Sequence, residues 1–265
     1  MRLTTPKWLL GHALVVAVVL SFTQFGFWQL RRHAERTALN EVAVARASAA
    51  PVSLDEALAA AAAEVADGAD PALALRERRV RVAGWFEPDD EVLRRPVSRD
   101  GMPGYHVVTP LRLEDDPDGR RLWVERGWVP DSLNRVPVAE APPPAGRVEV
   151  VGWLRATTAP PQGWVAAIAP RDPPTGRLAT VAYLDPERLR DQVGGPLAPA
   201  VLWLASIEGV PAHEAAAAGG SLPWPPEPHE VTMGPHLGYA IQWFAFVLVT
   251  VVGYAALLRR VLREG

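Results

Sequence analysis

Cysteine is absent from the 265 residues of the chain, and lysine occurs only once, at Lys7. A chain without cysteine has no disulfides, thiolate metal sites, iron–sulfur clusters, covalently attached CxxCH haem or cysteine nucleophiles. Neither sign of charge is in strong excess, since the formal net charge is -3 and the pI is about 6.1. The sequence therefore lacks the basic surface of a nucleic-acid-binding protein, and we expect no nucleic-acid partner.

The sequence motifs of common catalytic sites are missing as well. The chain contains no GxSxG, Walker, HExxH or GxGxxG sequence. The acidic pairs Asp89-Asp90 and Asp115-Asp116 fall in turn-forming sequence, and the histidines between the chain ends lack metal-ligand spacing. We therefore expect a protein that is not an enzyme. The alternative, a membrane-anchored extracytoplasmic enzyme, requires a convergent acid and base that the sequence does not reveal.

Long apolar runs are what the chain does have, one near each end. Trp8–Leu30 and Leu237–Leu258 contain no charged residue over 23 and 22 positions. As a helix, each run reaches roughly 33 Å, enough to cross the hydrocarbon core of a bilayer. A buried core helix is the alternative for either run, and a cleaved signal peptide is the alternative for the first. The first run ends in bulky residues with no small-x-small cleavage site, which favours an uncleaved anchor.

The arginines around the second run predict the orientation of the chain in the membrane. Two glutamates, Glu227 and Glu230, precede this run, and three arginines follow it, at Arg259, Arg260 and Arg263. Because basic residues favour the cytoplasmic side, we expect both termini in the cytoplasm of a multi-pass protein of the cell membrane. The expected order is a cytoplasmic segment 1–7, transmembrane helix 8–30, extracytoplasmic domain 31–236, transmembrane helix 237–258 and cytoplasmic segment 259–265.

The middle of the chain predicts a small β-rich α+β domain. Ser53 and Glu56 fit a capping box that opens a helix over 54–66, and Asp185-Pro186 begins a second helix that ends near Val193. Residues with period-two alternation begin at 78, and turn-forming sequence separates them into successive strands. We expect an antiparallel meander of strands 78–86, 91–97, 105–113 and 120–129, followed by a buried strand 200–207. Pro142–Pro144 reads as a linker between strand groups, and 211–235 as a tether that contains Gly219-Gly220.

Polar and aromatic side chains gather where the first apolar run ends and the second begins. With both termini on one side, these segments reach the same outer face of the membrane. The expected rim consists of Trp28, Gln29, Arg31 and Arg32 around the end of the first run and His236, Tyr239, Gln242 and Trp243 around the start of the second. A histidine beside two arginines can ligate haem iron while the arginines pair with propionates. The alternatives are aromatic anchors at the membrane interface and amide hydrogen bonds between two helices.

Five short sequences resemble those of one known family. In chain order they are GFWQLRR (26–32), RVRVAGWF (79–86), GYHVVTPL (104–111), VERGWVP (124–130) and HLGYAIQW (236–243). They resemble stretches of the surfeit locus protein family, whose members are assembly factors for haem–copper cytochrome c oxidase. Two departures are Glu125, where the family often has Asn, and Gly234-Pro235, where Asn-Asn is common before the histidine.

The resemblance implies that the chain presents or inserts haem a into the oxidase catalytic subunit. It implies His236 as the ligand of the haem iron, with the other rim residues around the cofactor. The implied partners are the catalytic subunit, haem a synthase and the lipid bilayer. The alternative within this family is a scaffold that binds oxidase subunits or haem a synthase but no haem. In that case Gln24, Gln29 and Gln242 act as interhelical hydrogen-bonding residues.

Overall fold

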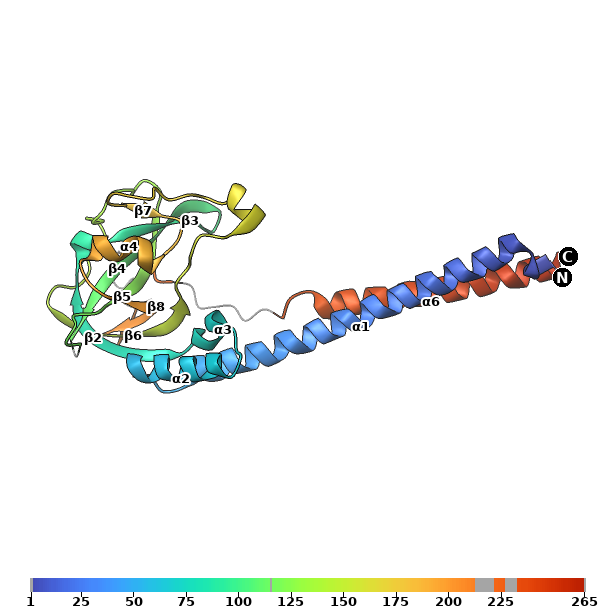
Figure 1. The fold of residues 1–265 in the computed structure, drawn as a ribbon, viewed down its shortest axis with the longest axis horizontal. Coiled ribbons are helices and arrows are strands. Elements are labelled where there is room, and N and C mark those ends of the chain that lie inside the picture. The colour runs from blue at the N-terminus through green and yellow to red at the C-terminus, as the bar shows by residue number, and fades with distance from the viewer. Residues whose placement is uncertain (1, 115, 213–221, 227–232, 265) are drawn as a thin grey trace. The chain divides into compact units, whose positions relative to one another are not determined.

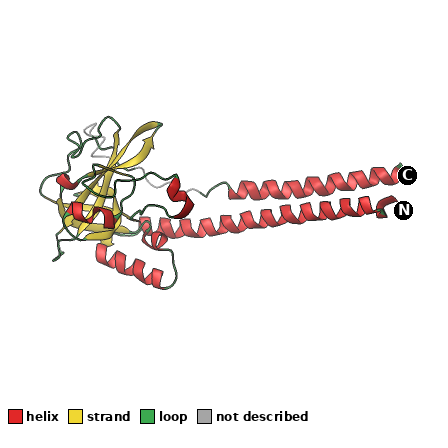
Figure 2. Cartoon of the chain, turned by 45° about the horizontal axis from the view of Figure 1, so that its top comes forward, coloured by secondary structure: helices red, strands yellow, loops and turns green. Residues whose placement is uncertain are grey.

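A computed structural model shows a chain of two compact units (Figure 1). The structure describes residues 2–114, 116–212, 222–226 and 233–264. The first unit comprises residues 1–42 and 230–265, and the second comprises residues 43–229. Each unit has its own architecture, one helical and one built on strands (Figure 2).

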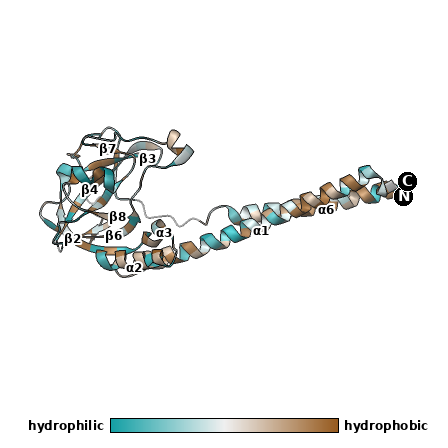
Figure 3. Cartoon of the chain, viewed as in Figure 1, coloured by the Kyte–Doolittle hydropathy of each residue, from teal (hydrophilic) through white to brown (hydrophobic). Residues whose placement is uncertain are grey.

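The first unit contains two long helices, α1 (Pro6–Ser48) and α6 (His236–Arg263), with a short 3-10 helix η1 (Arg2–Thr4) before them. Both are long and apolar enough to cross a membrane, and almost none of their most apolar segments is buried. Figure 3 shows this apolar character along α6 and along the part of α1 nearer the N-terminus. Such exposed apolar surface is what a bilayer, rather than a protein core, would cover.

Helix α1 continues well past the apolar run that begins it. It has 43 residues, which is about 65 Å of helix and roughly twice the thickness of a bilayer core. The sequence analysis ends the predicted membrane helix at Leu30, but residues 31–48 contain neither glycine nor proline and are rich in alanine and arginine. Strong helix formers therefore extend the helix until Pro51 disfavours helical backbone before it.

Aromatic rings hold α1 and α6 together as an antiparallel pair within the first unit. Trp243 lies against Phe22 and Phe25, with ring centroids 5.4 and 5.0 Å apart. At the other end of the pair, the Tyr254 hydroxyl is hydrogen-bonded to Nδ1 of His12. The low-numbered residues of α1 thus meet the high-numbered residues of α6, as antiparallel packing requires.

The second unit is built on one mixed sheet. Its strands are β1 (Val52–Ser53), β2 (Arg79–Phe86), β3 (Val92–Arg99), β4 (Met102–Leu113), β5 (Arg121–Pro130), β6 (Arg147–Ala156), β7 (Thr180–Val181), β8 (Leu197–Ile207) and β9 (Val210–Pro211). The order is β1-β2-β6-β8-β5-β4-β3-β7, and β2 also pairs with β4. This extra pairing closes β2, β4, β5, β8 and β6 into a five-stranded barrel.

The barrel combines antiparallel pairs with one parallel pair, β5 with β8. A closed five-stranded Greek-key barrel with this strand order is of the OB type. Closure depends on Gly84, because a Cβ atom there would collide with the backbone carbonyl of Arg112 on β4. Glycine at this position lets β2 approach β4 closely enough to seal the barrel.

The predicted four-stranded meander is only partly correct. β3, β4 and β5 are consecutive antiparallel neighbours, as expected. β2 was expected beside β3, but it pairs with β4 over Gly84–Phe86 and with β6 over Arg79–Trp85. Turn sequences predict which strands follow one another, whereas barrel closure depends on contacts between distant strands.

Capped helices cover the barrel, and two of the caps were predicted. Ser53 Oγ accepts from the backbone N–H of Glu56 at the start of α2 (Leu54–Ala66), and Asp185 Oδ1 accepts from Glu187 N–H at the start of α4 (Pro186–Val193). The remaining helices are α3 (Pro71–Leu75), capped by Asp70, and the 3-10 helices η2 (Pro88–Asp90) and η3 (Gly163–Ala167).

Two groups of apolar side chains form most of the core of the second unit. The first fills the barrel and includes Leu54 and Ala57 of α2. In the second group, Leu189 and Val193 of α4 pack on Trp123 of β5 and its neighbours. Figure 1 accordingly shows α4 lying over the strands.

Two segments read as linkers in the sequence belong to the folded unit. Pro142–Pro144 does not separate two domains, because the strands on both sides join one sheet and the preceding Ala141 is fully buried. In the expected tether 211–235, Trp224 pairs with Trp128 through two backbone hydrogen bonds of 2.6 and 2.8 Å, and their rings stack 5.1 Å apart. Gly219-Gly220, Glu227 and Glu230 lie outside the described residues.

A buried ion pair crosses the interior of the second unit. Arg126 Nη2 lies 2.7 Å from Glu91 Oε2, and both side chains are almost completely buried. Thr109 Oγ1 donates to the same carboxylate at 2.6 Å, and the Val138 N–H donates to its other oxygen at 2.9 Å. The carboxylate is therefore fully compensated, which a buried charge requires.

We predict that Arg126→Met strongly destabilises the protein, because the substitution leaves the buried Glu91 carboxylate without its cation. Removing one partner of a buried pair typically costs about 3–5 kcal/mol. Urea unfolding of the detergent-solubilised chain, followed by tryptophan fluorescence, measures the effect. The control is Arg147→Met, since Arg147 pairs with Glu114 at the surface. Equal unfolding midpoints for the two variants would contradict the assignment.

Candidate functional site

The expected ligand histidine lies in the first turn of α6 and contacts the middle of α1. His236 is the first residue of α6. Its Nδ1 atom lies 2.9 Å from Oε1 of Gln29 on α1. Gln29 is only 8% exposed, so its amide is held in place by the helix pair. The structure thus brings together one residue from each apolar run, as predicted for the rim.

This hydrogen bond determines the tautomer of the His236 ring. An amide oxygen can only accept, so Nδ1 of His236 carries the proton and donates it. The lone pair then resides on Nε2, for which we find no hydrogen bond among the described residues. Metal-binding histidines commonly have this arrangement, with one ring nitrogen held by an acceptor and the other available.

A hollow of about 360 Å³ lies beside His236. Arg32, Glu35, Arg36 and Leu39 of α1, together with Gly234 and His236, line it. Arg32 pairs with Glu35 at 3.1 Å, but more than half of each side chain is exposed. An exposed pair of this kind contributes little and is easily exchanged, so Arg32 can pair with an anionic group that enters the hollow.

Six of the eight predicted rim residues do not line this hollow, Gln29 among them. Trp28 and Tyr239 are 45% and 47% exposed, and Arg31 and Gln242 are also exposed. Trp243 packs against rings of α1 instead. The hollow therefore contains His236 and Arg32, and Gln29 orients the histidine from the helix interface.

Sequence reasoning missed Glu35, Arg36 and Leu39 as part of the hollow. The signal is present, because Arg32, Glu35, Arg36 and Leu39 have the i, i+3, i+4, i+7 spacing of one helix face. A helix that ends at Leu30 does not carry this face, whereas α1 continues to Ser48.

His12, the histidine within the first apolar run, has both ring nitrogens engaged. Nδ1 is hydrogen-bonded to the Tyr254 hydroxyl, and Nε2 lies 3.1 Å from the carbonyl oxygen of Leu3. These contacts give His12 a role in packing the helices.

His106 belongs to a separate charged cluster in the second unit. Its Nδ1 is hydrogen-bonded to the Glu125 carboxylate, and Arg94 lies 3.1 Å from the same oxygen. Trp203 lies against His106, with Arg155 over the Trp203 ring. Among the described residues there is no group of three or more His, Asp or Glu side chains arranged to hold a metal ion. His106 is thus part of a satisfied structural network, as its strand position suggested.

The partners of Glu125 keep this buried carboxyl ionised. Burial by itself would raise the pKa of Glu125, but the His106 hydrogen bond and the charges of Arg94 and His106 outweigh it. The net result is a pKa of about 2, below the usual value of 4.5. Glu125 therefore carries its charge throughout the physiological range and is unsuited to proton transfer near neutral pH.

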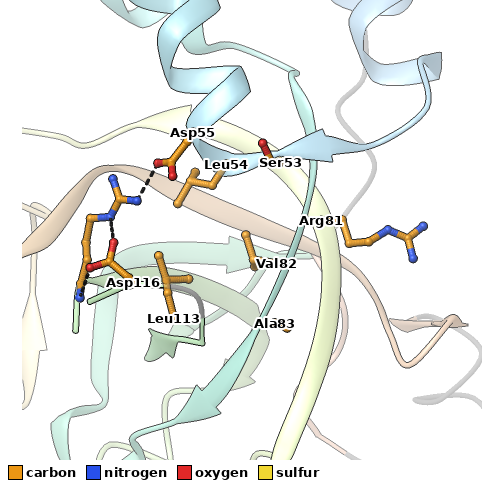
Figure 4. A pocket seen from close by; sticks show the side chains of 9 residues that line it. Ser53, Leu54, Asp55, Arg81, Val82, Ala83, Leu113 and Asp116 are labelled. Carbon is orange, nitrogen blue, oxygen red and sulfur yellow. Dashed lines mark hydrogen bonds and ion pairs between the residues drawn. The ribbon is translucent and has the colours of Figure 1, made fainter. Parts of the chain in front are cut away.

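Another hollow, of about 130 Å³, opens between the start of α2 and strand β2. Figure 4 shows Asp55 and Asp116 beside it, and both carboxylates pair with Arg120, at 2.6 and 2.8 Å. The only cation at the rim besides Arg120 is Arg81, which pairs with Glu149. The charges in this part of the described structure are thus paired with one another, which favours a structural role.

Comparisons with known proteins agree on one family. The profile of the SURF1 family matches residues 16–248. Uncharacterized SURF1-like proteins of Mycobacterium bovis and Mycobacterium tuberculosis are 28% identical over 253 residues, covering 95% of this chain and 83% of each relative. A SURF1-like protein of Dictyostelium discoideum is 40% identical over 65 residues, 23% of either chain.

We predict that acid weakens the second unit through Glu125. Because the folded-state pKa lies below the unfolded value, its contribution is complete above about pH 4.5 and is lost as the pH falls towards 2. Urea midpoints measured across this range should fall for the parent chain. They should fall less for Glu125→Gln, which carries no charge to lose. Parallel decreases in both proteins would show that other groups cause the acid sensitivity.

Proposed function

This chain belongs to the SURF1 family, which is associated with cytochrome oxidase assembly, and from that membership we propose a non-enzymatic assembly factor for haem–copper cytochrome c oxidase. Its specific task in this proposal is to present or insert haem a into the catalytic subunit. The partners are that subunit and haem a synthase. The site is the hollow beside His236.

One observation carries the haem part of the proposal, namely the orientation of His236. Gln29 accepts from Nδ1 and leaves the lone pair of Nε2 available, which is the state that an iron ligand requires. Haem, when bound, would supply an iron that takes a nitrogen ligand and two propionate carboxylates. Gln29 orients the ring through a neutral amide, so the contact that holds His236 involves no ion pair.

The arginines of the hollow fit the anionic part of the same cofactor. Arg32 and Arg36 line the hollow with His236, and guanidinium groups pair with carboxylates in a bidentate manner. Arg32 presents an exposed side chain there, and its partner Glu35 is equally exposed. The hollow thus offers one imidazole and two guanidiniums beside one carboxylate, Glu35, and a propionate would take the place of Glu35 at Arg32.

Membrane insertion of both long helices is part of this proposal. The arrangement is a multi-pass protein of the cell membrane with cytoplasmic termini and an extracytoplasmic domain. Support comes from the length and apolarity of α1 and α6 and from the arginines at the end of α6. Haem a is a lipophilic cofactor, and the hollow lies just beyond the ends of both apolar runs, where such a cofactor would leave the apolar phase.

A scaffold that binds no haem is the second candidate. The observation that favours it is the same Gln29–His236 hydrogen bond, because polar side chains also join neighbouring helices in membranes. In that reading His236 only stabilises the helix pair. The two candidates differ in whether His236 is needed for a haem spectrum.

We predict that the detergent-purified chain, co-expressed with haem a synthesis, shows a Soret band that His236→Ala loses. The reason is that Nε2 of His236 is the available ligand nitrogen at the hollow. His12→Ala is the matched control and should keep the band, because both nitrogens of His12 are engaged elsewhere. A chain without any Soret band would exclude haem binding and leave the scaffold. A band that survives His236→Ala would place the iron at another residue.

Gln29→Ala should weaken haem binding while leaving the ligand histidine in place. Loss of a group that orients a metal ligand typically costs about 10- to 100-fold in affinity. Titration of the purified variant with haem, followed at the Soret band, measures this change. Gln24→Ala is the control, since Gln24 lies on the same helix with an exposed side chain. Equal haem affinities for the two variants would show that Gln29 does not contribute to haem binding.

A further inference from the structure

The loop between β6 and β7 presents an apolar tip that the proposed function does not use. The 3-10 helix η3 and the residue after it expose Trp164 to 80%, Val165 to 36% and Ile168 to 77%. Figure 1 shows this short helix, in yellow, standing away from the strands. Exposure of a large aromatic and an aliphatic side chain at one projecting point is unusual for a surface that faces only water.

The tip is an ordered turn. The N–H groups of Ile168 and Ala169 donate to the carbonyl oxygen of Val165, at 3.2 and 3.1 Å. Arg171 donates from Nη2 to the carbonyl oxygen of Ala166 at 2.9 Å. These bonds satisfy backbone groups within the turn itself, so that the tip can enter an apolar medium at a lower cost.

The charge around the tip is one-sided. Residues 156–170 contain no charged side chain, and the exposed Arg171 follows directly. The nearest carboxylate, Asp172, is turned to the domain, where it accepts from the backbone N–H groups of Ala182 and Tyr183. It also pairs with Arg95 at 3.3 Å. Segments that enter the surface of an anionic bilayer commonly combine an apolar tip with an adjacent basic residue.

We propose that Trp164, Val165 and Ile168 insert into the headgroup region of the lipid bilayer, with Arg171 at the phosphates. Three side chains offer at most a few hundred Å² of contact, far below the roughly 1,600 Å² of a stable protein interface. A lipid bilayer suits a small convex apolar tip, because its fluid molecules can rearrange around the inserted side chains. Tryptophan is the residue most typical of this depth in a membrane.

Tethering makes so small an anchor effective. If α1 and α6 span the membrane, the second unit is confined near a bilayer, and the insertion becomes an intramolecular step at high effective concentration. Insertion of the tip would fix the orientation of the domain at the membrane. The inference rests on the membrane insertion of the two helices and is independent of haem binding.

The absence of cysteine allows a direct test with single labels on the full-length chain. Ile168→Cys, carrying the environment-sensitive fluorophore NBD, reports on the tip after reconstitution into vesicles of phosphatidylcholine and phosphatidylglycerol in equal parts. Ser132→Cys is the control at an exposed position of the second unit, and Val249→Cys reports on the middle of α6. Lipids with a nitroxide near the headgroup end of the acyl chain serve as quenchers for the tip, and lipids with a nitroxide near the methyl end serve for Val249, because its label would lie near the middle of the bilayer.

We expect blue-shifted emission and strong quenching by these lipids for the labels at Ile168 and Val249, and neither for Ser132. A quenched Val249 label with an unquenched Ile168 label would overturn the insertion of the tip and leave the spanning helices intact. An Ile168 label that is blue-shifted but not quenched would mean a protein contact, which also contradicts the proposal. An unquenched Val249 label would refute the spanning helices and, with them, the tether.

Discussion

The bulge at Arg126 in β5 is the feature on which the second unit depends. Opposite β4, Val107 pairs with Gly127 and Val108 with Glu125, so Arg126 is an extra residue in the strand. A bulge of this kind re-aims its side chains, and here the guanidinium points into the interior to meet Glu91. Gly127 has a φ of 147°, and the carbonyl oxygen of Trp224 occupies the space that a Cβ would need. The bulge therefore also leaves room for the backbone of Trp224 to pair with β5 at Trp128.

Side chains of β5 point alternately to opposite faces of the sheet, and two separate polar networks form as a result. Glu125, one residue before the bulge, faces away from the interior side of Arg126 and collects Arg94 and His106. One network joins β4, β5, the loop after β5 and Glu91, which lies between η2 and β3. The other joins β3, β4 and β5 on the opposite face. Both consist of charges that are satisfied internally, so they specify how the strands meet and offer no group for chemistry.

Local chemistry made parts of this architecture predictable. Ser53 and Asp185 mark the starts of helices, because their side-chain oxygens accept from backbone N–H groups of the first turn. Each of these hydrogen bonds joins residues at most three positions apart in the sequence. The alternation from residue 78 onward likewise reflects which side of a strand is buried. Closure at Gly84 and the parallel pair of β5 with β8 join residues far apart in sequence, so no local pattern encodes them. The same reason explains why Trp224 was read as part of a tether.

Helix periodicity predicts part of the candidate site, namely which residues share a face of each helix. Spacing correctly put His236 near Gln29 once two antiparallel helices were assumed, but it could not give the rotation of each helix. That rotation is set by the rings of Phe22, Phe25 and Trp243, which place Trp243 in the helix interface.

The difference between the two histidines shows where exchangeable binding can occur. At His106 the ring nitrogen meets a carboxylate and a guanidinium, so the ring belongs to a charge network that stabilises the fold. At His236 the partner is a neutral amide, and beside it lie arginines on an exposed helix face. Occupying Nε2 of His236 breaks no ion pair, whereas disturbing His106 would remove one of the two side chains that compensate the buried charge of Glu125 and leave Arg94 alone to do so. The ligand exchange that we propose therefore suits the helix pair better than the charged cluster of the second unit.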